Sequence, residues 1–194
     1  MTAMRCLQPP AGAAAAAAAR HRAALPVLET ARLRLRAPRM EDLPLWVAIW
    51  TAPDCHERMS EERAWEEFCV YAAGWLLHGH GAWALERRRD GVPVGFVLLG
   101  LEWGDEAPEI GWALAHGARG QGYAAEAARA VQAHAAALLG DEGALSYIAA
   151  ANAASIRVAE RIGARRLADF DPTTRLYAHP GADAATPAPQ ERQP

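Results

Sequence analysis

Alternating leucines and arginines predict an edge strand early in the chain. From Thr30 to Arg36, Leu33 and Leu35 point to one side of an extended backbone and the arginines point to the other. This two-residue period is typical of a strand with one buried face. Pro38 follows directly and ends the strand.

Apolar residues at three- and four-residue spacing then predict two helices. The first begins at Glu41 and is stopped by Pro53, and its apolar face carries Leu45, Trp46, Ile49 and Trp50. The second runs from Glu61 to His78, with Ser60 in the N-cap position. Its predicted apolar stripe consists of Trp65, Phe68, Cys69, Ala72, Trp75 and Leu76.

Three further strands are predicted at Ala82–Glu86, Val92–Leu101 and Pro108–Ala115. The pair Asp90-Gly91 between the first two is a hairpin signal. With the edge strand they would form an antiparallel meander, in which the mostly apolar Val92–Leu101 takes a central place. Gly111 suggests a bulge or a close backbone approach in the last of these strands.

The rest of the pattern alternates helices and strands. The predicted elements are a helix Ala124–Leu139 stopped by Gly140, a strand Ala144–Ala150, a helix capped by Asn152 and closed by Gly163, and a hairpin of Ala164–Asp169 and Thr174–Ala178.

Both ends of the chain differ in composition from this pattern. Residues 1–27 are rich in alanine and contain no acid before Glu29. We predict a disordered tail there, although a basic, acid-poor targeting peptide has the same composition. Residues 180–194, rich in proline, alanine and glutamine, are predicted to form a second disordered tail, which leaves residues 28–179 as the domain.

Composition narrows the class of protein. The 194 residues are 52% hydrophobic and 22% charged, as expected for one soluble globular domain. The formal net charge of -3 argues against non-specific binding to nucleic acid. No run is apolar enough to cross a bilayer. An odd count of three cysteines without a pairing framework suggests a reducing compartment, so we expect a cytoplasmic location.

The stretch Arg119-Gly120-Gln121-Gly122-Tyr123-Ala124, here called the anion loop, joins a predicted strand to a predicted helix. Glycines at such a junction let the backbone approach a ligand closely. A helix N-terminus offers unpaired N–H groups and a partial positive charge, both of which favour a phosphate. The anion loop therefore predicts a phosphate or pyrophosphate site, and Arg119 adds a full positive charge.

Known phosphate-binding loops differ in sequence, so they can be compared with this one. A Walker loop requires Gly-Lys-Ser/Thr, which is absent here. Residues 120–125 match the dinucleotide pattern G-x-G-x-x-A, but Asp141 and Glu142 precede the next strand and Asn152 follows it, so the expected terminal acid is missing. Residues 119–124 match in full the acyl-CoA loop Q/R-x-x-G-x-G/A of the GNAT acetyltransferases. An ordinary glycine turn capping a helix is the remaining interpretation.

Four phrases extend this match along the chain. They are Glu29-Thr30-x-Arg32-Leu33-x-Leu35-Arg36, Glu109-Ile110-Gly111-Trp112-x-Leu114, the anion loop with x-Glu126-Ala127, and Asn152-x-x-Ser155-x-x-Val158-x-Glu160-Arg161-x-Gly163-Ala164. From about Leu28 to His179 the chain resembles the GNAT N-acetyltransferases, most closely the branch with the RimJ and RimL ribosomal-protein N-terminal acetyltransferases. The resemblance implies a mixed α+β fold with a mostly antiparallel central sheet flanked by helices.

The resemblance also implies a donor and its binding residues. Acetyl-CoA would be the co-substrate, and no metal would be required. Backbone groups of Trp112, Ala113 and Leu114 would hold the pantetheine arm as an additional strand. Asn152 would hydrogen-bond the pantetheine or the departing sulfur. The pyrophosphate would bind the amides of Gly120, Gln121, Gly122, Tyr123, Ala124 and Ala125. His116-Gly117-Ala118 departs from the proline and aromatic residue that many members carry before this loop.

Acetyl transfer to an amine requires a base for the amine proton and a proton for the leaving thiolate. Glu109 is our candidate base, and its alternative is a surface position on a strand. Tyr177 is our candidate acid, and its alternative is a core aromatic. Ser155 could assist or only bond the helix start. Backbone N–H groups beside the expected bulge at Gly111 would stabilise the oxyanion.

The expected partners are acetyl-CoA and an amine, either a small molecule or a protein N-terminus, with no nucleic acid or membrane partner. Glu62, Glu66 and Glu67 could attract the amine or form a solvated helix face. The seven tryptophans could supply a homodimer interface or the core. Two other functions remain open: a non-catalytic CoA-binding module on the same fold, and a dinucleotide-dependent oxidoreductase, which would need a parallel sheet.

Overall fold

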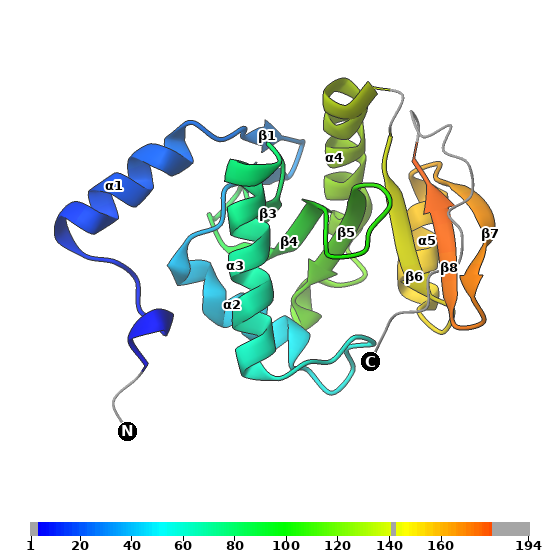
Figure 1. Ribbon diagram of the computed structural model, residues 1–194, viewed down its shortest axis with the longest axis horizontal. Coiled ribbons are helices and arrows are strands. Elements are labelled where there is room, and N and C mark those ends of the chain that lie inside the picture. Colours follow the sequence, from blue (N-terminus) through cyan, green and yellow to red (C-terminus); the bar gives the residue numbers. More distant parts are fainter. Residues whose placement is uncertain (1–3, 141–142, 180–194) are drawn as a thin grey trace.

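An eight-stranded sheet forms the centre of the structure (Figure 1). The computed structural model describes residues 4–140 and 143–179. The strands lie in the order β1-β2-β3-β4-β5-β6-β8-β7. They are β1 (Leu28–Glu29), β2 (Leu33–Arg36), β3 (Ala82–Arg87), β4 (Pro93–Gly100), β5 (Glu109–Leu114), β6 (Leu145–Ala149), β7 (Arg165–Asp171) and β8 (Thr174–Ala178).

The strand pairing confirms the mostly antiparallel sheet and the meander of β2 to β5. The edge position predicted for β2 is wrong, because the short strand β1 pairs with its outer side. Every neighbouring pair is antiparallel except β5 and β6. The parallel sheet required by a dinucleotide-dependent oxidoreductase is therefore not formed. The bulge expected at Gly111 is also wrong, because β4 and β5 pair in regular register past it. A Cβ atom at Gly111 would instead lie 3.2 Å from the Leu98 side chain, which is the close approach that the glycine permits.

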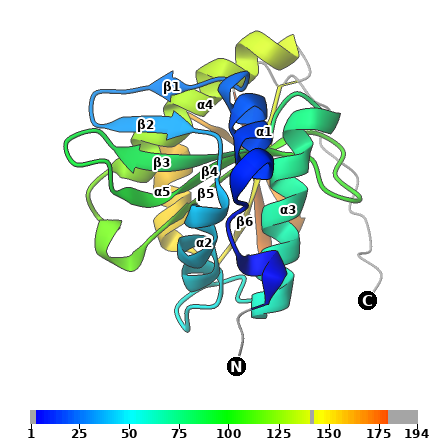
Figure 2. The same cartoon turned by 90° about the vertical axis from the view of Figure 1, so that its left-hand side faces the viewer.

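Helices cover both faces of this sheet (Figure 2). Helices α2 (Leu43–Trp50) and α3 (Glu61–Leu77) pack on one face, and α4 (Tyr123–Leu139) and α5 (Ala153–Arg161) pack on the other. The sequence of β4 is almost wholly apolar because both faces of this strand are buried. Phe96 and Leu98 belong to the core under α2 and α3, whereas Val97 and Leu99 belong to the core under α4. Short 3-10 turns at Met40–Asp42 (η2) and His116–Ala118 (η3) precede α2 and the anion loop.

The helix caps confirm two sequence predictions. The Ser60 hydroxyl accepts a hydrogen bond from the backbone N–H of Arg63 at 3.1 Å. The Asn152 Oδ1 atom accepts one from the N–H of Ser155 at 3.0 Å. Each bond satisfies one of the unpaired donors at a helix start, so the predicted starts of α3 and α5 coincide with the observed ones.

The predicted apolar stripe of α3 is wrong at its end. Leu76 is 88% exposed and Ala72 is also exposed, while Phe68 and Trp75 are buried. Helical residues advance by roughly 100°, so Trp75 returns close to the direction of Phe68, whereas Leu76 is rotated about 80° away. Phe68 and Trp75, seven positions apart, are therefore buried, whereas Ala72 and Leu76, which continue the four-residue spacing, are exposed to solvent.

The alanine-rich segment forms a helix rather than the predicted disordered tail. Helix α1 (Gly12–Ala23) extends away from the sheet in Figure 1 and buries no residue. Alanine has the highest helix propensity of all residues, which favours this local structure without tertiary contacts. The chain is anchored before the predicted boundary at Leu28, because the Trp83 indole N–H donates to the Pro26 carbonyl at 3.0 Å. A third 3-10 turn (η1, Arg5–Leu7) precedes α1. The predicted tail at residues 180–194 lies outside the described residues.

Candidate active site

A cavity of about 970 Å³ lies where β5 and β6 separate. The two strands pair only at Glu109 and Leu145. Beyond this vertex, β5 remains paired with β4 along one edge as far as Leu114. Its other edge faces the cavity instead of β6, so backbone groups there can bind an extended ligand as a neighbouring strand would.

A buried polar network lies beside the vertex. The Ser146 hydroxyl donates to the Ile110 carbonyl and contacts His179 Nε2 at 2.8 Å, while Gln132 Nε2 lies 3.0 Å from His179 Nδ1. Burial lowers the pKa of His179 to about 4, so the ring is neutral at pH 7. Ser146 donates its only hydroxyl proton to the Ile110 carbonyl. The Ser146 oxygen can then accept a hydrogen bond from Nε2 of the neutral His179 ring. This network therefore joins β5, β6 and β8 and does not form a nucleophile.

The anion loop lies at the cavity, as the sequence predicts. Gly120 and Gly122 have φ angles of 74° and 81°, which belong to the left-handed region that glycine adopts without strain. Gly122 is the N-cap residue of α4. Gly120, Gly122, Ala124 and Ala125 all line the cavity. The start of α4 is thus an anion-binding geometry open to a ligand.

The charge of Arg119 is partly compensated, which the sequence did not indicate. Its guanidinium pairs with the Asp54 carboxylate and donates from Nε to the Leu114 carbonyl at 3.3 Å. The hydrogen bond from Arg119 lowers the pKa of Asp54. Two cations that sequence reasoning missed, Arg157 and Arg161, also line the cavity. Their spacing of four residues on α5 is the signal that could have identified them.

Most of the other predicted binding residues reach the cavity. Trp112, Ala113 and Leu114 line it from β5, and Asn152 and Ser155 line it from the start of α5. The Trp112 indole N–H donates to the Ser155 hydroxyl at 3.3 Å, which connects the two sides. The Oδ1 atom of Asn152 already accepts the capping bond of α5. The NH2 group of this side chain remains to donate a hydrogen bond to a ligand.

Gln121 and Tyr123 belong to the anion loop but do not line the cavity. The Gln121 side chain turns back, and its Nε2 atom donates to the Gly117 carbonyl at 2.9 Å. The Tyr123 ring is 4% exposed and packs in the core under α4. Their side chains therefore shape the loop, and their backbone amides remain the predicted contacts.

Tyr177 is not brought to the site. Its side chain is 1% exposed and packs with apolar residues of α4, α5 and β6, and its hydroxyl has no hydrogen-bond partner among the described residues. It does not line the cavity. The geometry therefore corresponds to the alternative interpretation of Tyr177 as a core aromatic.

Glu109 lies at the vertex, half-buried, and its side chain lines the cavity. The backbone N–H of Tyr147 donates to its Oε1 atom at 3.2 Å. Burial raises the pKa of Glu109 well above its ordinary value, and the nearby Glu102, Glu57 and Asp105 raise it further. The ionised form of a carboxyl group with a raised pKa is a stronger base than an ordinary carboxylate.

Sequence reasoning missed the residues that share this part of the cavity with Glu109. They are Glu57, Tyr71 and Glu102. The Tyr71 hydroxyl donates to Glu102, and burial raises the pKa of Tyr71, as do the carboxylates around it. The Tyr71 ring fits only because Gly100 has no side chain, since a Cβ atom there would collide with it. No local pattern marks a tyrosine on an amphipathic helix as a lining residue.

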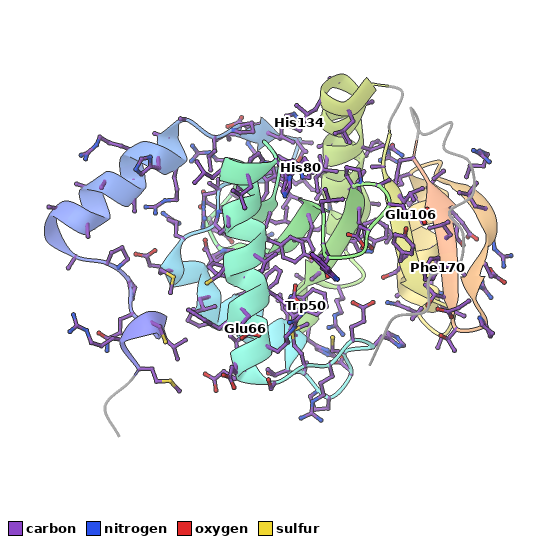
Figure 3. All side chains as sticks on the ribbon, viewed as in Figure 1. Trp50, Glu66, His80, Glu106, His134 and Phe170 are labelled. Atoms are coloured by element: carbon purple, nitrogen blue, oxygen red, sulfur yellow. The ribbon has the colours of Figure 1, made fainter. Side chains whose placement is uncertain are left out.

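The acidic side of α3 is not at the cavity. Glu66 is exposed and does not line it, and Figure 3 shows this side chain on α3. Glu67 is buried and paired with Arg63. The carboxylates at the cavity are therefore a different set from the Glu62, Glu66 and Glu67 that the sequence suggested.

The described residues offer neither a metal cluster nor a membrane-spanning helix. Residues 4–140 and 143–179 contain no cluster of three or more His, Cys, Asp or Glu side chains that could hold a metal ion. Within the same residues, no helix has the length and apolarity needed to span a membrane.

Comparison with known proteins identifies the family. Residues 32–165 match the family described as acetyltransferase (GNAT) domain. An acetyltransferase from Agrobacterium tumefaciens str. C58 is similar in structure, with a TM-score of 0.75 and 31% identity over 80% of this chain and 95% of that chain. A GNAT-family acetyltransferase from Bordetella pertussis has a TM-score of 0.67 and 30% identity over 79% of this chain and 98% of that chain.

More distant structures share the fold. One is RimL, described as a ribosomal L7/L12 alpha-N-protein acetyltransferase in complex with coenzyme A, with a TM-score of 0.62 and 17% identity over 79% of this chain and 97% of that chain. No curated protein matches the chain. Because the family match covers more than half of its length, the chain belongs to the GNAT acetyltransferase family and is an acyltransferase.

Proposed function

We propose that the protein transfers an acetyl group from acetyl-CoA to a primary amine by direct attack of the amine in a ternary complex. One observation carries this proposal: a single cavity connects the anion loop to the half-buried carboxyl of Glu109 along the unpaired edge of β5. Five steps along β5 separate Glu109 from Leu114, roughly 17 Å. The cavity can therefore hold an extended donor with its phosphates at the anion loop and its thioester near Glu109.

Glu109 is the proposed base. One carboxylate oxygen is held by the Tyr147 N–H, which orients the group and leaves the other oxygen for the amine proton. Glu57 and Glu102 also line the cavity and add negative charge, which attracts a protonated amine. The proton then passes from the amine to Glu109, so that a neutral nitrogen attacks the thioester carbon and the thiolate leaves.

Ser155 is the proposed proton donor to the thiolate, in place of Tyr177: it gives its hydroxyl proton to the leaving sulfur and takes up the second proton of the attacking nitrogen. Its oxygen accepts from the Trp112 indole, so its own hydroxyl proton is available to a group in the cavity. Ser155 lies in the first turn of α5, where the partial positive charge of the helix start favours an anion. The proposed roles of Glu109 and Ser155 thus come from two elements that meet across the cavity.

The acceptor is a primary amine of a small molecule or of a protein N-terminus. RimL-type structures with the same fold act on a ribosomal protein, which supports the second class as a candidate. Release of CoA in the presence of small amines and of short peptides with a free N-terminus would distinguish the two. We further propose a cytoplasmic location and a homodimer. Sedimentation of the purified protein can test the homodimer.

The donor can be tested by thermal unfolding with and without acetyl-CoA. A ligand at a hundredfold excess over its dissociation constant stabilises the native state by about 2.7 kcal/mol. For a chain of this length that corresponds to a rise in Tm of roughly 5–10 °C. We expect this rise with acetyl-CoA and not with NAD or ATP.

Gly122→Glu should abolish the rise, because it places a negative charge and a strained φ of 81° at the N-cap of α4. Gly117→Glu is the matched control, since Gly117 has open space around its Cα, lacks a positive φ and does not line the cavity. A rise with NAD, or none with acetyl-CoA, would refute the proposed donor. A rise without CoA release for any amine would favour the non-catalytic CoA-binding module.

Ser155→Ala is expected to lower kcat by about 10²-fold, the lower end of the effect of losing a general acid. The fold should be unaffected, because Asn152 caps α5 through the backbone N–H of residue 155. Tyr177→Phe should keep kcat within about twofold, since it removes a buried hydroxyl that has no described partner. Initial rates of CoA release at saturating substrates measure both variants. The reverse order of effects would restore Tyr177 as the acid.

A further inference from the structure

Arg32 and Glu126 form a network that connects the start of β2 to the anion loop. The Glu126 carboxylate accepts from the Thr30 hydroxyl at 2.6 Å, from the Arg32 backbone N–H at 2.9 Å and from Arg32 Nε at 2.6 Å. Its Oε2 atom also lies 2.6 Å from Arg32 Nη2. These residues are more than 90 positions apart in the chain, and together they hold the turn before β2 against the first turn of α4.

The same guanidinium holds the anion loop itself. Arg32 Nη1 donates to the Gln121 carbonyl at 2.9 Å, and the Arg32 guanidinium lies 4.6 Å from the centre of the Tyr123 ring. The C=O and N–H of one trans peptide unit point in opposite directions. Because Arg32 holds the Gln121 carbonyl, the N–H of Gly122 in that same peptide unit points away from Arg32. Gly122 lines the cavity, so this orientation presents an amide donor to it.

Arg32 also neutralises a charge that would oppose an anion. Glu126 lies in the first turn of α4, one turn from the loop glycines. Burial opposes its ionisation, but hydrogen bonds from Thr30 and Arg32 outweigh burial and lower the pKa of Glu126. An ionised carboxylate without its arginine would repel a phosphate at the helix start.

We propose that Arg32 is a positioning residue for the donor's pyrophosphate: it orients the Gly122 amide through the Gln121 carbonyl and cancels the charge of Glu126. It does not line the cavity, so it acts through the loop rather than by contact. This inference rests on the proposed acetyl-CoA function. It explains why the Glu29-Thr30-x-Arg32 phrase at one end of the domain accompanies the anion loop and Glu126 near its middle.

The test is steady-state kinetics of Arg32→Gln with two donors. With acetyl-CoA, we expect KM for the donor to rise about tenfold, as for the loss of one charge-assisted hydrogen bond, with kcat within about twofold. With S-acetylpantetheine, which lacks the pyrophosphate, KM should be unchanged. The double variant Arg32→Gln/Glu126→Gln should recover part of the acetyl-CoA affinity, because the bare carboxylate is then absent.

Arg88→Gln is the matched control. Arg88 is exposed to a similar degree and donates to the Thr30 carbonyl at 2.8 Å, but makes no described bond to the anion loop. It should leave KM for acetyl-CoA unchanged. An unchanged KM in Arg32→Gln, or an equal rise with both donors, would overturn the inference while the wild-type thermal shift upholds the donor. A wild type without that shift would overturn both.

Discussion

Glu109→Gln is expected to lower kcat by about 10²–10⁴-fold, the usual effect of removing a general base. The substitution keeps the shape and the hydrogen bond from the Tyr147 N–H, so it removes the basicity of the group and little else. Acetyl-CoA should still raise the Tm of this variant. The measurement is the initial rate of CoA release at saturating amine and donor.

The pH dependence gives Glu109 a second signature. Only its ionised form accepts a proton, and burial raises its pKa, so kcat/KM of the wild type should increase as pH rises through that raised value. Glu109→Gln should lack this increase of kcat/KM with pH. Glu66→Gln, on the exposed side of α3, is the matched control and should retain both the rate and the pH profile. An unchanged kcat in Glu109→Gln would assign the base to another group.

The same raised pKa makes Glu109 costly for stability. Below the pKa of the unfolded chain, at about pH 4, both states carry a protonated carboxyl and Glu109 costs nothing. As pH rises through the folded-state value, the folded protein must ionise a buried group, and stability falls. Glu109→Gln should therefore be more stable than the wild type at pH 7–8 and equally stable near pH 4, as urea unfolding at the two pH values would show.

Asp42→Ala is expected to lower the free energy of unfolding by about 3–5 kcal/mol, as for breaking a buried ion pair. Asp42 is 2% exposed, and its two oxygens accept from Arg36 Nη1 and Nη2 at 2.7 and 2.9 Å. It also accepts from the Arg39 N–H at 2.8 Å, which caps the turn before α2. Burial opposes the charge of Arg36, but bonds to Asp42 and Glu86 outweigh it and raise the pKa of Arg36. Without Asp42, that buried cation keeps only Glu86 as its acid partner.

Urea unfolding measures the loss, with the double variant Arg36→Met/Asp42→Leu as the comparison. Removing both charges should cost less than removing Asp42 alone, because the buried Arg36 cation is then absent and Glu86 keeps Arg39 at 3.7 Å as a partner. Glu29→Gln is the surface control: it breaks an exposed pair with Arg88 at 3.8 Å and should change stability by less than about 0.5 kcal/mol. Equal losses in Asp42→Ala and Glu29→Gln would contradict the ion-pair explanation.

The elements of the fold were predictable where the signal is local. Alternation marked β2, the continuous apolar run marked β4 as central, and Ser60 and Asn152 marked two helix starts. These signals depend on the backbone period and on donors within one turn, which are the same in any tertiary context. The anion loop belongs with them, because its glycines and the helix behind it are adjacent in sequence.

Predictions failed where the deciding partner is distant in sequence. Tyr177 on the last hairpin was a candidate acid with a core aromatic as the alternative, and residues of α4 and α5 bury it. Tyr71 and Glu102 reach the cavity from α3 and from the segment after β4, and the glycine that admits the Tyr71 ring is 29 residues away from it. Arg32 showed only the pattern of an edge strand, and its bonds to Gln121 and Glu126 appear only in the folded chain.

The sequence by itself determined the order of helices and strands from β2 onward, the starts of α3 and α5, the anion loop and the family resemblance, because each depends on residues within a few positions of one another. Only the tertiary structure decided that β5 and β6 part after one paired position, and therefore that a cavity exists and which carboxylates line it. The contacts at this vertex join Ser146, Ile110 and His179, residues up to 69 positions apart, and no local period records such contacts.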